Sequence, residues 1–421
     1  MALHYRRIVI FIIALAIIVT LFILILVTGG YILLVTPLLL IYIIYKYRKA
    51  PVPIKIVVLG FPNAGKTVLL ASMYHQMITQ GQAGCTLEVK PEQRSKLINI
   101  YDHIADTQKD FPSPTALGET TEWTFTGRVR AGKGFYSVFT FTYLDFAGER
   151  GSNLFKSDYT SFDADFEKTL RNADILLGIL DGQEVLRFMR GDGGEHFYRD
   201  VLNMLIILTN REKPVHFILT KWDLLEGTYQ LRQVIERLEE IDQFRNFVIS
   251  HTQSSTLRLI PVSSLGKGFA REENGVMRKN RGALMHTFQV EMPLICSLLD
   301  YSEVDIKKLK IFTEKLGASS EFIPWDTGVL AWLLTSHISL TLGIFSVNFP
   351  TFKELLQQPS LVKGERPKAD INNGRNPLEG QIRNRREAQK YIYRQFFNQL
   401  DLLENRFPES NLSNVERGSQ K

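Results

Sequence analysis

A turn bounded by two glycines, with a lysine and a threonine at its end, occupies residues 60–67 (Gly-Phe-Pro-Asn-Ala-Gly-Lys-Thr). In this spacing successive backbone N–H groups can point at a phosphate, Lys66 can reach its outer oxygens, and the Thr67 hydroxyl can bind Mg²⁺. An apolar run precedes the turn and a helical pattern follows it, so the positive end of that helix adds to the anion site. The stretch predicts a nucleotide phosphate site, formed by Gly60, Asn63, Ala64, Gly65, Lys66, Thr67 and Val68.

A second candidate group stands where a β-rich run ends, at residues 145–149 (Asp-Phe-Ala-Gly-Glu). Asp145 is expected to join the Mg²⁺ shell. The Gly148 N–H is expected to meet the γ-phosphate, because glycine permits close approach. Lys66 and Gly148 are therefore expected catalytic residues of a phosphate-cleaving reaction.

The third group, residues 220–223 (Thr-Lys-Trp-Asp), predicts which base is bound. The Asp223 carboxylate can accept from both N1–H and N2–H of guanine, and the Lys221 stem can lie along the base plane. Adenine lacks that pair of donors and would leave a buried carboxylate unpaired. The backbone of Ser263 and Ser264, after a later apolar run, is placed to meet the guanine O6. We therefore expect GTP or GDP, with Mg²⁺, and disfavour ATP.

The elements that would position these groups alternate between strand and helix patterns. Apolar runs predict strands, a helix with proline at its start is expected over 91–106, and two β-rich runs around the turn 131–134 predict a hairpin. Further helices are expected after residue 67, over 195–211 and over 378–403. The expected strands are 54–60, 86–90, 124–130, 135–144, 173–180, 215–220 and 257–262. This alternation predicts an α/β fold with a mostly parallel sheet and flanking helices.

In this order, residues 60–67, 145–148, 220–223 and 262–266 resemble the GTPases of the TRAFAC/Ras-like P-loop superfamily. More narrowly, residues 65–74, the long segment before Asp145 and residues 290–294 are similar to the bacterial double-GTPase-type domains. The order of an apolar N-terminus and a GTPase also resembles the membrane-anchored β subunit of the signal-recognition-particle receptor, in architecture only. The resemblance covers about residues 54–300 and implies a GTPase-type P-loop fold.

Three departures from that family pattern bear on activity. The segment between Lys66 and Asp145 is long for a small GTPase, so an insertion is expected within 81–120. The threonine that should face Mg²⁺ and the γ-phosphate is not fixed: Thr120 and Thr121 are best placed, with Thr115 as an alternative. Glu149 stands where Ras-type GTPases carry the glutamine that orients the attacking water. The resemblance therefore implies Glu149 as a further catalytic residue, which could position water or act as a base, but the change puts intrinsic hydrolysis in doubt. We expect a slow GTPase switch, with a catalytically inactive GTP-binding scaffold as the alternative.

Composition sets the class of the protein. The 421 residues are 45% hydrophobic and 22% charged, which is typical of a globular chain with room for a full α/β core. The net charge of +6 comes without a long basic run, so we expect no nucleic-acid partner. The two cysteines stand in unrelated contexts, which excludes a disulfide framework and a cysteine-based zinc site.

The N-terminus predicts membrane anchoring. Residues 8–28 are uncharged and long enough to span a bilayer as a helix, and residues 29–45 form a second, shorter apolar run. Basic residues precede the first run (Arg6, Arg7) and follow the second (Lys46, Arg48, Lys49). Positive charge prefers the cytoplasmic side, so a two-helix hairpin, which places both clusters there, is favoured over a single span. We therefore expect the lipid bilayer as a partner, with the GTPase domain in the cytoplasm, at the inner or plasma membrane if the protein is bacterial. An effector or activating protein is also expected, and the sequence does not identify it.

These boundaries divide the chain into a membrane region (1–49), a GTPase domain (50–300), a helical C-terminal extension (301–407) and a disordered tail (408–421). Residues 328–347 are uncharged, but polar side chains fill their middle, which favours a buried or interfacial helix over a third span. Residues 362–377 are typical of a linker. The helix expected over 378–403 could dock on the core, bind a partner helix or lie on anionic lipid, and docking is the favoured outcome.

Overall fold

The structure, a computed structural model, describes residues 53–79, 84–112, 120–131, 134–146, 164–192, 194–209, 213–273, 276–302 and 385–413. All of them belong to one compact unit, Pro51–Lys421. Several predictions fall outside the described residues, namely those for 8–28, 29–45, 328–347, 362–377, Thr115, Gly148 and Glu149. Within the described ranges, no helix has the length and apolar character that crossing a bilayer requires.

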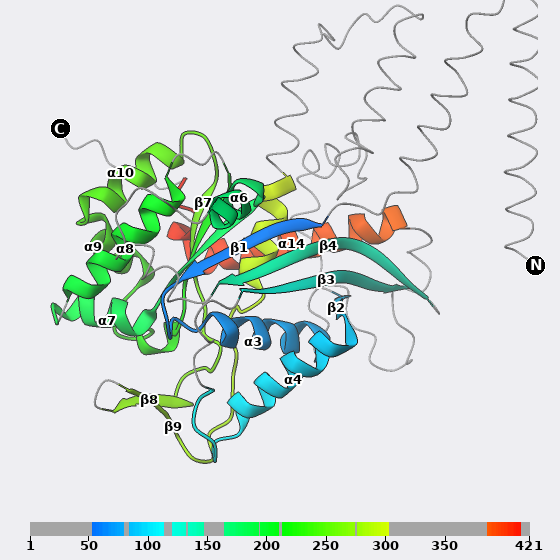
Figure 1. Ribbon diagram of the computed structural model, residues 1–421, viewed down its shortest axis with the longest axis horizontal. Helices are drawn as coiled ribbons and strands as arrows, with labels where there is room; N and C mark the ends of the chain where they lie inside the picture. The colour runs from blue at the N-terminus through cyan, green and yellow to red at the C-terminus, as the bar shows by residue number, and fades with distance from the viewer. Residues whose placement is uncertain are drawn as a thin grey trace, which may run out of the picture. The chain divides into compact units, whose positions relative to one another are not determined.

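A seven-stranded sheet with the strand order β2-β3-β4-β1-β5-β6-β7 forms the centre of the unit (Figure 1). Its strands are β1 (Ile54–Gly60), β2 (Cys85–Val89), β3 (Thr120–Ala131), β4 (Gly134–Phe146), β5 (Ile175–Leu180), β6 (Val215–Leu219) and β7 (Leu257–Pro261). β4, β1, β5, β6 and β7 run parallel, whereas β2 and β3 are antiparallel to their neighbours. The mostly parallel α/β fold predicted from the sequence is confirmed.

The parallel strands at the β7 side of the sheet are buried along their whole length. Every residue of β5, β6 and β7 is buried. Parallel strands are covered on both faces, so their sequences are expected to be continuously apolar rather than to alternate between apolar and polar residues. This burial fixes the strands in place and leaves the loops at their carboxyl ends to carry chemistry.

The predicted hairpin around residues 131–134 is confirmed as β3 and β4. The two strands pair antiparallel from Thr120↔Phe146 to Ala131↔Gly134, with a register irregularity at Gly127/Arg128. Gly127 is required there, because a Cβ atom at this position would lie 2.3 Å from the Phe139 ring. The hairpin extends the sheet on the side of β1 opposite to β5.

Helices flank the sheet, as the sequence predicted. In Figure 1, α3 and α4 lie beside the β1–β3 part and α7–α10 gather beside β5–β7. The described helices also include α14 and two short 3₁₀ helices, η2 and η4. The bounds are α3 (Lys66–Thr79), α4 (Pro91–Ala105), α6 (Ala164–Asn172), α7 (Gly182–Arg190), α8 (Gly194–Leu208), η2 (Trp222–Leu224), α9 (Leu231–Glu239), α10 (Asp242–His251), α14 (Arg385–Arg406) and η4 (Pro408–Ser410).

A small separate hairpin, which the sequence did not predict, follows the last strand of the sheet. It consists of β8 (Ala270–Glu273) and β9 (Val276–Lys279). The Lys279 ammonium donates to the carbonyls of His103 and Asp106, where α4 ends. A cation at the carbonyl end of a helix is favourable, so this contact ties the hairpin to α4.

The C-terminal helix α14 packs on the sheet. Phe396 is 1% exposed and its ring lies 6.0 Å from that of Phe139 in β4, and the Gln389 amide donates to the Val138 carbonyl. Docking on the core is therefore what the structure shows for this helix. An apolar stripe on α14 supplies the contacts, as the spacing of its aromatic and leucine residues indicated.

The predicted disordered tail from residue 408 is wrong for its first residues. Residues 408–410 form η4, and the Leu412 N–H donates to the Leu257 carbonyl at 3.0 Å. Leu412 is buried, and Asn411 forms a β-bridge with Arg258. This segment therefore covers the free edge of β7, where unpaired backbone groups would otherwise be exposed.

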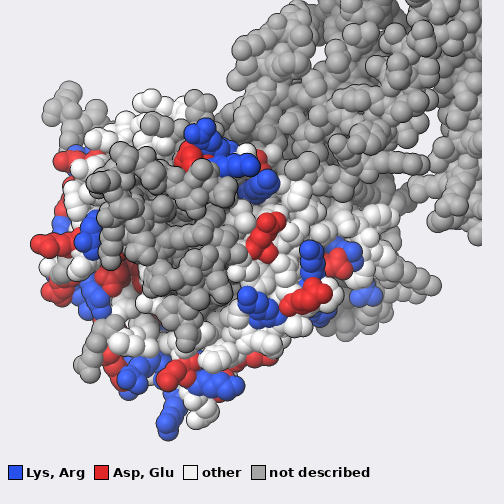
Figure 2. Space-filling view, viewed as in Figure 1, with Lys and Arg blue, Asp and Glu red and all other residues white. Residues whose placement is uncertain are grey.

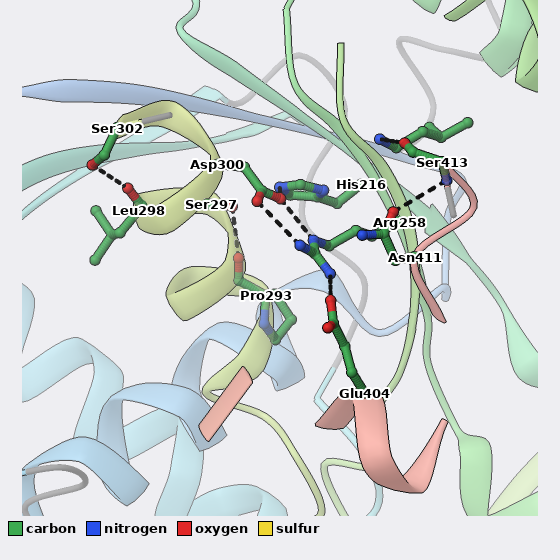
Figure 3. A network of polar contacts seen from close by, with 11 residues as sticks. His216, Arg258, Pro293, Ser297, Leu298, Asp300, Ser302, Glu404, Asn411 and Ser413 are labelled. Atoms are coloured by element: carbon green, nitrogen blue, oxygen red, sulfur yellow. Dashed lines mark hydrogen bonds and ion pairs between the residues drawn. The ribbon is translucent and has the colours of Figure 1, made fainter. Parts of the chain in front are cut away.

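A buried ionic network joins β7 to α14 and to a helical segment at residues 292–302 (Figure 3). Arg258 of β7 makes a two-pronged contact with Asp300, at 2.7 and 3.2 Å, and a further contact with Glu404 of α14 at 2.7 Å. Arg258 and Asp300 are nearly inaccessible, with 5% and 3% of their side chains exposed. His216 of β6 lies beside this pair. The network fixes the helical segment 292–302 and α14 to the sheet.

On the molecular face shown in Figure 2, the described basic and acidic side chains are interspersed. Several of the described charged residues form surface ion pairs, including Arg232 with Glu236. Exposed pairs of this kind contribute little to stability. This face of the described residues therefore presents no concentrated patch of one sign.

Cys85 and Cys296 are both buried and free, in agreement with the exclusion of a disulfide framework.

Candidate functional site

The predicted site residues lie in loops at one edge of the sheet, where the parallel strands end. Gly60 at the end of β1 is level with Ile179 of β5, and Leu180 is level with Leu219 of β6. Leu219 is in turn level with Pro261 of β7. The loops after β1, β5, β6 and β7 therefore emerge side by side. In open α/β sheets this carboxyl edge is where ligands bind.

The loop from Gly60 to Lys66 has the curled backbone that its sequence predicted. Asn63 and Gly65 both have left-handed conformations, with φ of 63° and 84°. Asparagine and glycine are the residues that adopt this region most readily. At Gly60 a Cβ atom would lie 2.9 Å from the Ile179 Cβ, so the close approach of β1 and β5 also requires glycine. Helix α3 begins at Lys66 and places its positive end at the loop.

Lys66 lies inside this loop rather than in solvent. Its side chain is 8% exposed, and its ammonium donates to the carbonyls of Gly60 at 2.9 Å and Phe61 at 3.0 Å. These contacts hold the positive charge at the centre of the curl, where a phosphate would bind. Thr67 follows at the first turn of α3, which places it beside the same loop. Ala64 is buried and Val68 is partly buried.

Thr220 joins this phosphate loop to the loops after β5 and β6. Its hydroxyl contacts two carbonyl oxygens, that of Ala64 at 2.9 Å and that of Leu180 at 3.1 Å. Its side chain is almost fully buried. In the sequence Thr220 is only the first residue of the 220–223 motif. The structure shows that it connects three loops of the site.

Lys221 has a strained backbone and a fixed side chain. Its φ is 52°, an uncommon value for a residue other than glycine or asparagine. Strain of this kind costs about 1–3 kcal/mol and persists where the surroundings enforce it. Here the flanking amides enforce it: Thr220 N–H donates to the Leu180 carbonyl and Trp222 N–H to the Val262 carbonyl, both at 3.0 Å.

Asp181 is a site residue that sequence reasoning missed. One of its oxygens pairs with the Lys221 ammonium at 2.7 Å, and the other accepts from the Gln183 N–H at 2.9 Å as the N-cap of α7. The sequence signal was present, because an aspartate followed by glycine directly after a buried strand is typical of a helix N-terminus. Gly182 is required next to it, since a Cβ atom there would lie 2.1 Å from the Thr220 carbonyl oxygen.

Asp223 and Ser263, which the sequence predicts to meet the base, are in direct contact. The Ser263 hydroxyl donates to one Asp223 carboxylate oxygen at 2.5 Å and accepts from the Gly266 N–H at 2.8 Å. Burial raises the pKa of Asp223, and the hydrogen bond from Ser263 partly offsets this. A buried carboxylate with a raised pKa favours a ligand that supplies donors, because such donors stabilise the ionised form.

The backbone of Ser264, which the sequence predicts to face the guanine O6, contacts helix α3. Its carbonyl accepts from the Ser72 hydroxyl of α3 at 3.4 Å. Ser263 and Phe288 exchange two backbone hydrogen bonds, of 2.9 and 2.7 Å. The loop 263–266 is therefore held between α3 on one side and residue 288 on the other.

The predicted metal ligands come from three neighbouring elements. Asp145 of β4 is level with Val58 of β1 on one side and with Thr121 of β3 on the other. Thr120 is level with Phe146. The backbone thus brings Asp145 and Thr121 next to each other near the carboxyl end of β1. Among the described residues, no group of three or more His, Cys, Asp or Glu is placed to hold a metal ion. Mg²⁺ bound to a nucleotide needs fewer, since phosphates and waters fill its shell.

No protein-family model matches this sequence, and no curated protein is significantly similar to it. Solved structures with a distant likeness include a nucleolar GTP-binding protein of Plasmodium falciparum, with 10% identity over 64% of this chain and 96% of that chain (TM-score 0.32). They also include the signal recognition particle receptor SRb-GTP/SRX complex of Chaetomium thermophilum, with 14% identity over 52% of this chain and 93% of that chain (TM-score 0.30). A third is the Arl6 BBS3 small GTPase of Trypanosoma brucei, with 14% identity over 51% of this chain and 88% of that chain (TM-score 0.26). From likeness at this level we draw no functional conclusion.

Proposed function

We propose that the protein binds GTP and GDP with Mg²⁺ at the carboxyl edge of its sheet. The observation that carries the proposal is the physical connection of the phosphate loop to the base-recognition loop. Thr220 bonds to the Ala64 carbonyl, and Asp223, three residues later, holds Ser263. One ligand with a phosphate at one end and a base at the other fits this arrangement.

Each end of the ligand meets groups of suitable chemistry. The loop amides of residues 60–67, the Lys66 ammonium and the N-terminus of α3 would bind the phosphates. Asp223 would accept from N1–H and N2–H of guanine, and the backbone of 263–266 would face its O6. Adenine would offer the buried Asp223 carboxylate no pair of donors beyond the Ser263 hydroxyl, which costs about 1–3 kcal/mol or more for a charged group.

Mg²⁺ would be held by Thr67 and the bound phosphates, with Asp145 and Thr120 or Thr121 nearby. Mg²⁺ neutralises charge that develops on the phosphates during transfer. The chain's own residues would position the phosphates and the attacking water. Glu149 is the candidate for the latter task.

The reaction we propose is slow GTP hydrolysis, used as a switch. The presence or absence of the γ-phosphate would order or release loops at the nucleotide site. The second candidate is a GTP-binding scaffold without turnover, which the glutamate at position 149 favours, since Ras-type GTPases carry glutamine there. Both candidates would act on an effector or activating protein, and both fit anchoring through the apolar N-terminal runs 8–28 and 29–45 with the nucleotide site in the cytoplasm.

The test uses the full chain in detergent micelles, wild type beside Lys66→Ala and Glu149→Gln. A switch predicts GTP binding and phosphate release by the wild type, and loss of turnover in Lys66→Ala with an unchanged circular dichroism spectrum. A scaffold predicts GTP binding without phosphate release, even when membranes and cell extract are added. Glu149→Gln separates the two further: if Glu149 serves hydrolysis, the variant changes turnover while GTP affinity stays the same. Absence of guanine nucleotide binding in the wild type would contradict both candidates.

A further inference from the structure

The C-terminal end of α14 lies against both base-recognition loops, although the segment is far from them in the sequence. Phe407, directly after α14, is buried at 8% exposed. Its ring lies edge-on to that of Trp222, with centroids 5.9 Å apart and planes at 88°. Trp222 stands between Lys221 and Asp223 and is itself 2% exposed. The Phe407 ring therefore packs on the loop that carries the guanine-reading carboxylate.

The same phenylalanine also packs beside the second base loop. Phe407 and Phe288 lie edge-on, with centroids 6.3 Å apart and planes at 76°. Phe288 is the residue that exchanges two backbone hydrogen bonds with Ser263. Phe407 is thus one aromatic ring in contact with both loops, and edge-on aromatic pairs of this kind are favourable.

Arg406 reinforces these contacts from the surface. Its guanidinium stacks over the Phe288 ring at 4.4 Å and also faces the Phe407 ring at 5.6 Å. One of its nitrogens pairs with Glu226, three residues after Asp223, at 3.1 Å. Arg406 is about half exposed, so its ion pair is weakly stabilising by itself. Its geometry nonetheless links the same two loops that Phe407 links.

The rest of α14 is fixed elsewhere. Gln389 donates to the Val138 carbonyl of β4 and Phe396 packs on Phe139, while Glu404 joins the buried Arg258 network. The helix spans 22 residues, which is about 33 Å at 1.5 Å per residue. It therefore connects the base-recognition loops to a distant part of the sheet.

We propose that Phe407 and Arg406 are positioning residues for guanine, so that their contacts with the two base-recognition loops set the rate at which nucleotide leaves. The inference rests on the proposed GTP site. While these contacts are in place, Trp222 and Phe288 are held, and Asp223 and Ser263 keep the geometry that the base needs. When these contacts are lost, the base-recognition loops become more mobile and guanine dissociates faster. Phe407 and Arg406 do not contact the phosphate loop, so phosphate binding is unaffected.

The test is the dissociation rate of a fluorescent GDP analogue from the full chain in detergent micelles, chased with unlabelled GDP. In Phe407→Ala we expect a rise of about tenfold, because two aromatic pairs are removed. In Arg406→Ala we expect a rise of about threefold, since the cation–π contacts with Phe288 and Phe407 are lost. The affinity for pyrophosphate, which has no base, is expected to stay within about twofold of wild type in both variants.

Two matched controls separate positioning from general loosening. Phe396→Ala removes a buried phenylalanine from the same helix, and Arg394→Ala removes an exposed arginine from it. We expect Phe396→Ala to lower the melting temperature at least as much as Phe407→Ala while its GDP dissociation stays near wild type.

The proposal is overturned if Phe396→Ala accelerates GDP release as much as Phe407→Ala does. It is also overturned if Arg406→Ala, a surface change that leaves the core intact, releases GDP at the rate of Arg394→Ala. A wild type that binds no guanine nucleotide would remove the proposed function itself, before any variant is compared.

Discussion

Lys221 and Asp181 form an ion pair of 2.7 Å between the loops that follow two adjacent strands, 40 positions apart in the sequence. Both side chains are largely buried, at 18% and 14% exposed. The pair fixes the lysine that would lie along the base, and the same aspartate starts α7. Binding geometry and the packing of α7 are therefore coupled through one carboxylate.

Asp181→Asn separates those two roles. Asparagine is as good an N-cap as aspartate, so α7 should keep its start, whereas the ion pair to Lys221 is lost. We expect GDP affinity to fall about fivefold, which corresponds to about 1 kcal/mol, with a melting temperature close to wild type. Asp181→Ala should show the same loss of affinity and an additional stability loss of about 1 kcal/mol. Isothermal titration and thermal unfolding measure the two effects. Equal affinities of wild type and Asp181→Asn would show that the ion pair does not position the lysine.

Gly182→Ala tests the close approach of α7 to the base loop. The new methyl group would lie 2.1 Å from the Thr220 carbonyl oxygen, which is a backbone atom and cannot rotate away. We expect a destabilisation of about 1–3 kcal/mol and weaker GDP binding, because the loop that carries Lys221 must shift. Gly134→Ala is the control, since a methyl group added at Gly134 would meet no atom within 4 Å. Urea unfolding of both variants should separate them clearly, and equal midpoints would refute the steric argument.

The ionic network around Arg258 predicts an asymmetry between its two carboxylates. Asp300 is 3% exposed and accepts two hydrogen bonds from Arg258, whereas Glu404 is 34% exposed and accepts one. Removing one partner of a buried pair costs about 3–5 kcal/mol, because the other charge is left uncompensated. We expect a loss of that order in Asp300→Ala and a distinctly smaller one in Glu404→Ala, measured by urea unfolding. A larger effect for Glu404→Ala would mean that the network is not organised around Asp300.

His216 makes stability sensitive to acid. Burial, together with the nearby positive charge of Arg258 and with His251, lowers the pKa of His216 to about 3. The Nε2 atom of His216 lies 3.5 Å from Asp300, and this carboxylate would favour a protonated imidazole. The carboxylate is already paired with Arg258, however, so the net effect is a lowered pKa of His216. Between about pH 6.5 and pH 3 only the unfolded chain binds a proton at this residue, so stability falls as the pH falls through that window.

The corresponding variant is His216→Leu, which removes this titration from a buried position. The wild type should lose on the order of 1 kcal/mol more stability per pH unit than the variant between about pH 6 and pH 4. Urea midpoints measured at several pH values across that window give the difference. Parallel curves for the two proteins would contradict a neutral His216 in the folded state.

The core of the site was predictable because its signals are local. The curled turn at residues 60–67, the β3–β4 turn and the strand before Thr220 each carry their signature within a few residues, and the structure confirms the backbone of these elements. Strand ends then converge by topology alone, which is why Lys66 and Asp223 could be assigned to one edge without knowing the fold in detail.

Other contacts could not be predicted, because they join residues far apart in the sequence. No residue near Phe407 in the sequence indicates that its ring contacts Trp222. The short polar segment after α14 has the composition of a disordered tail, and its contact with β7 through Leu412 is visible only in the structure. The hairpin β8–β9 was missed because its strands have only four residues each, too few for a clear pattern. Asp181 was overlooked because its partner, Lys221, lies 40 positions away in the loop after another strand.

The central claim is that Asp223 reads guanine. The direct measurement is the affinity of the full chain in detergent micelles for GDP, ADP and XDP, wild type beside Asp223→Asn, with Asp242→Asn as an exposed control. We predict that the wild type and the control bind GDP at least about a hundredfold more tightly than ADP, which is about 2.7 kcal/mol. Asp223→Asn should lose that preference and gain relative affinity for XDP, because its amide can donate to the second carbonyl of xanthine. Equal binding of GDP and ADP by the wild type, or an unchanged guanine preference in Asp223→Asn, would contradict the account.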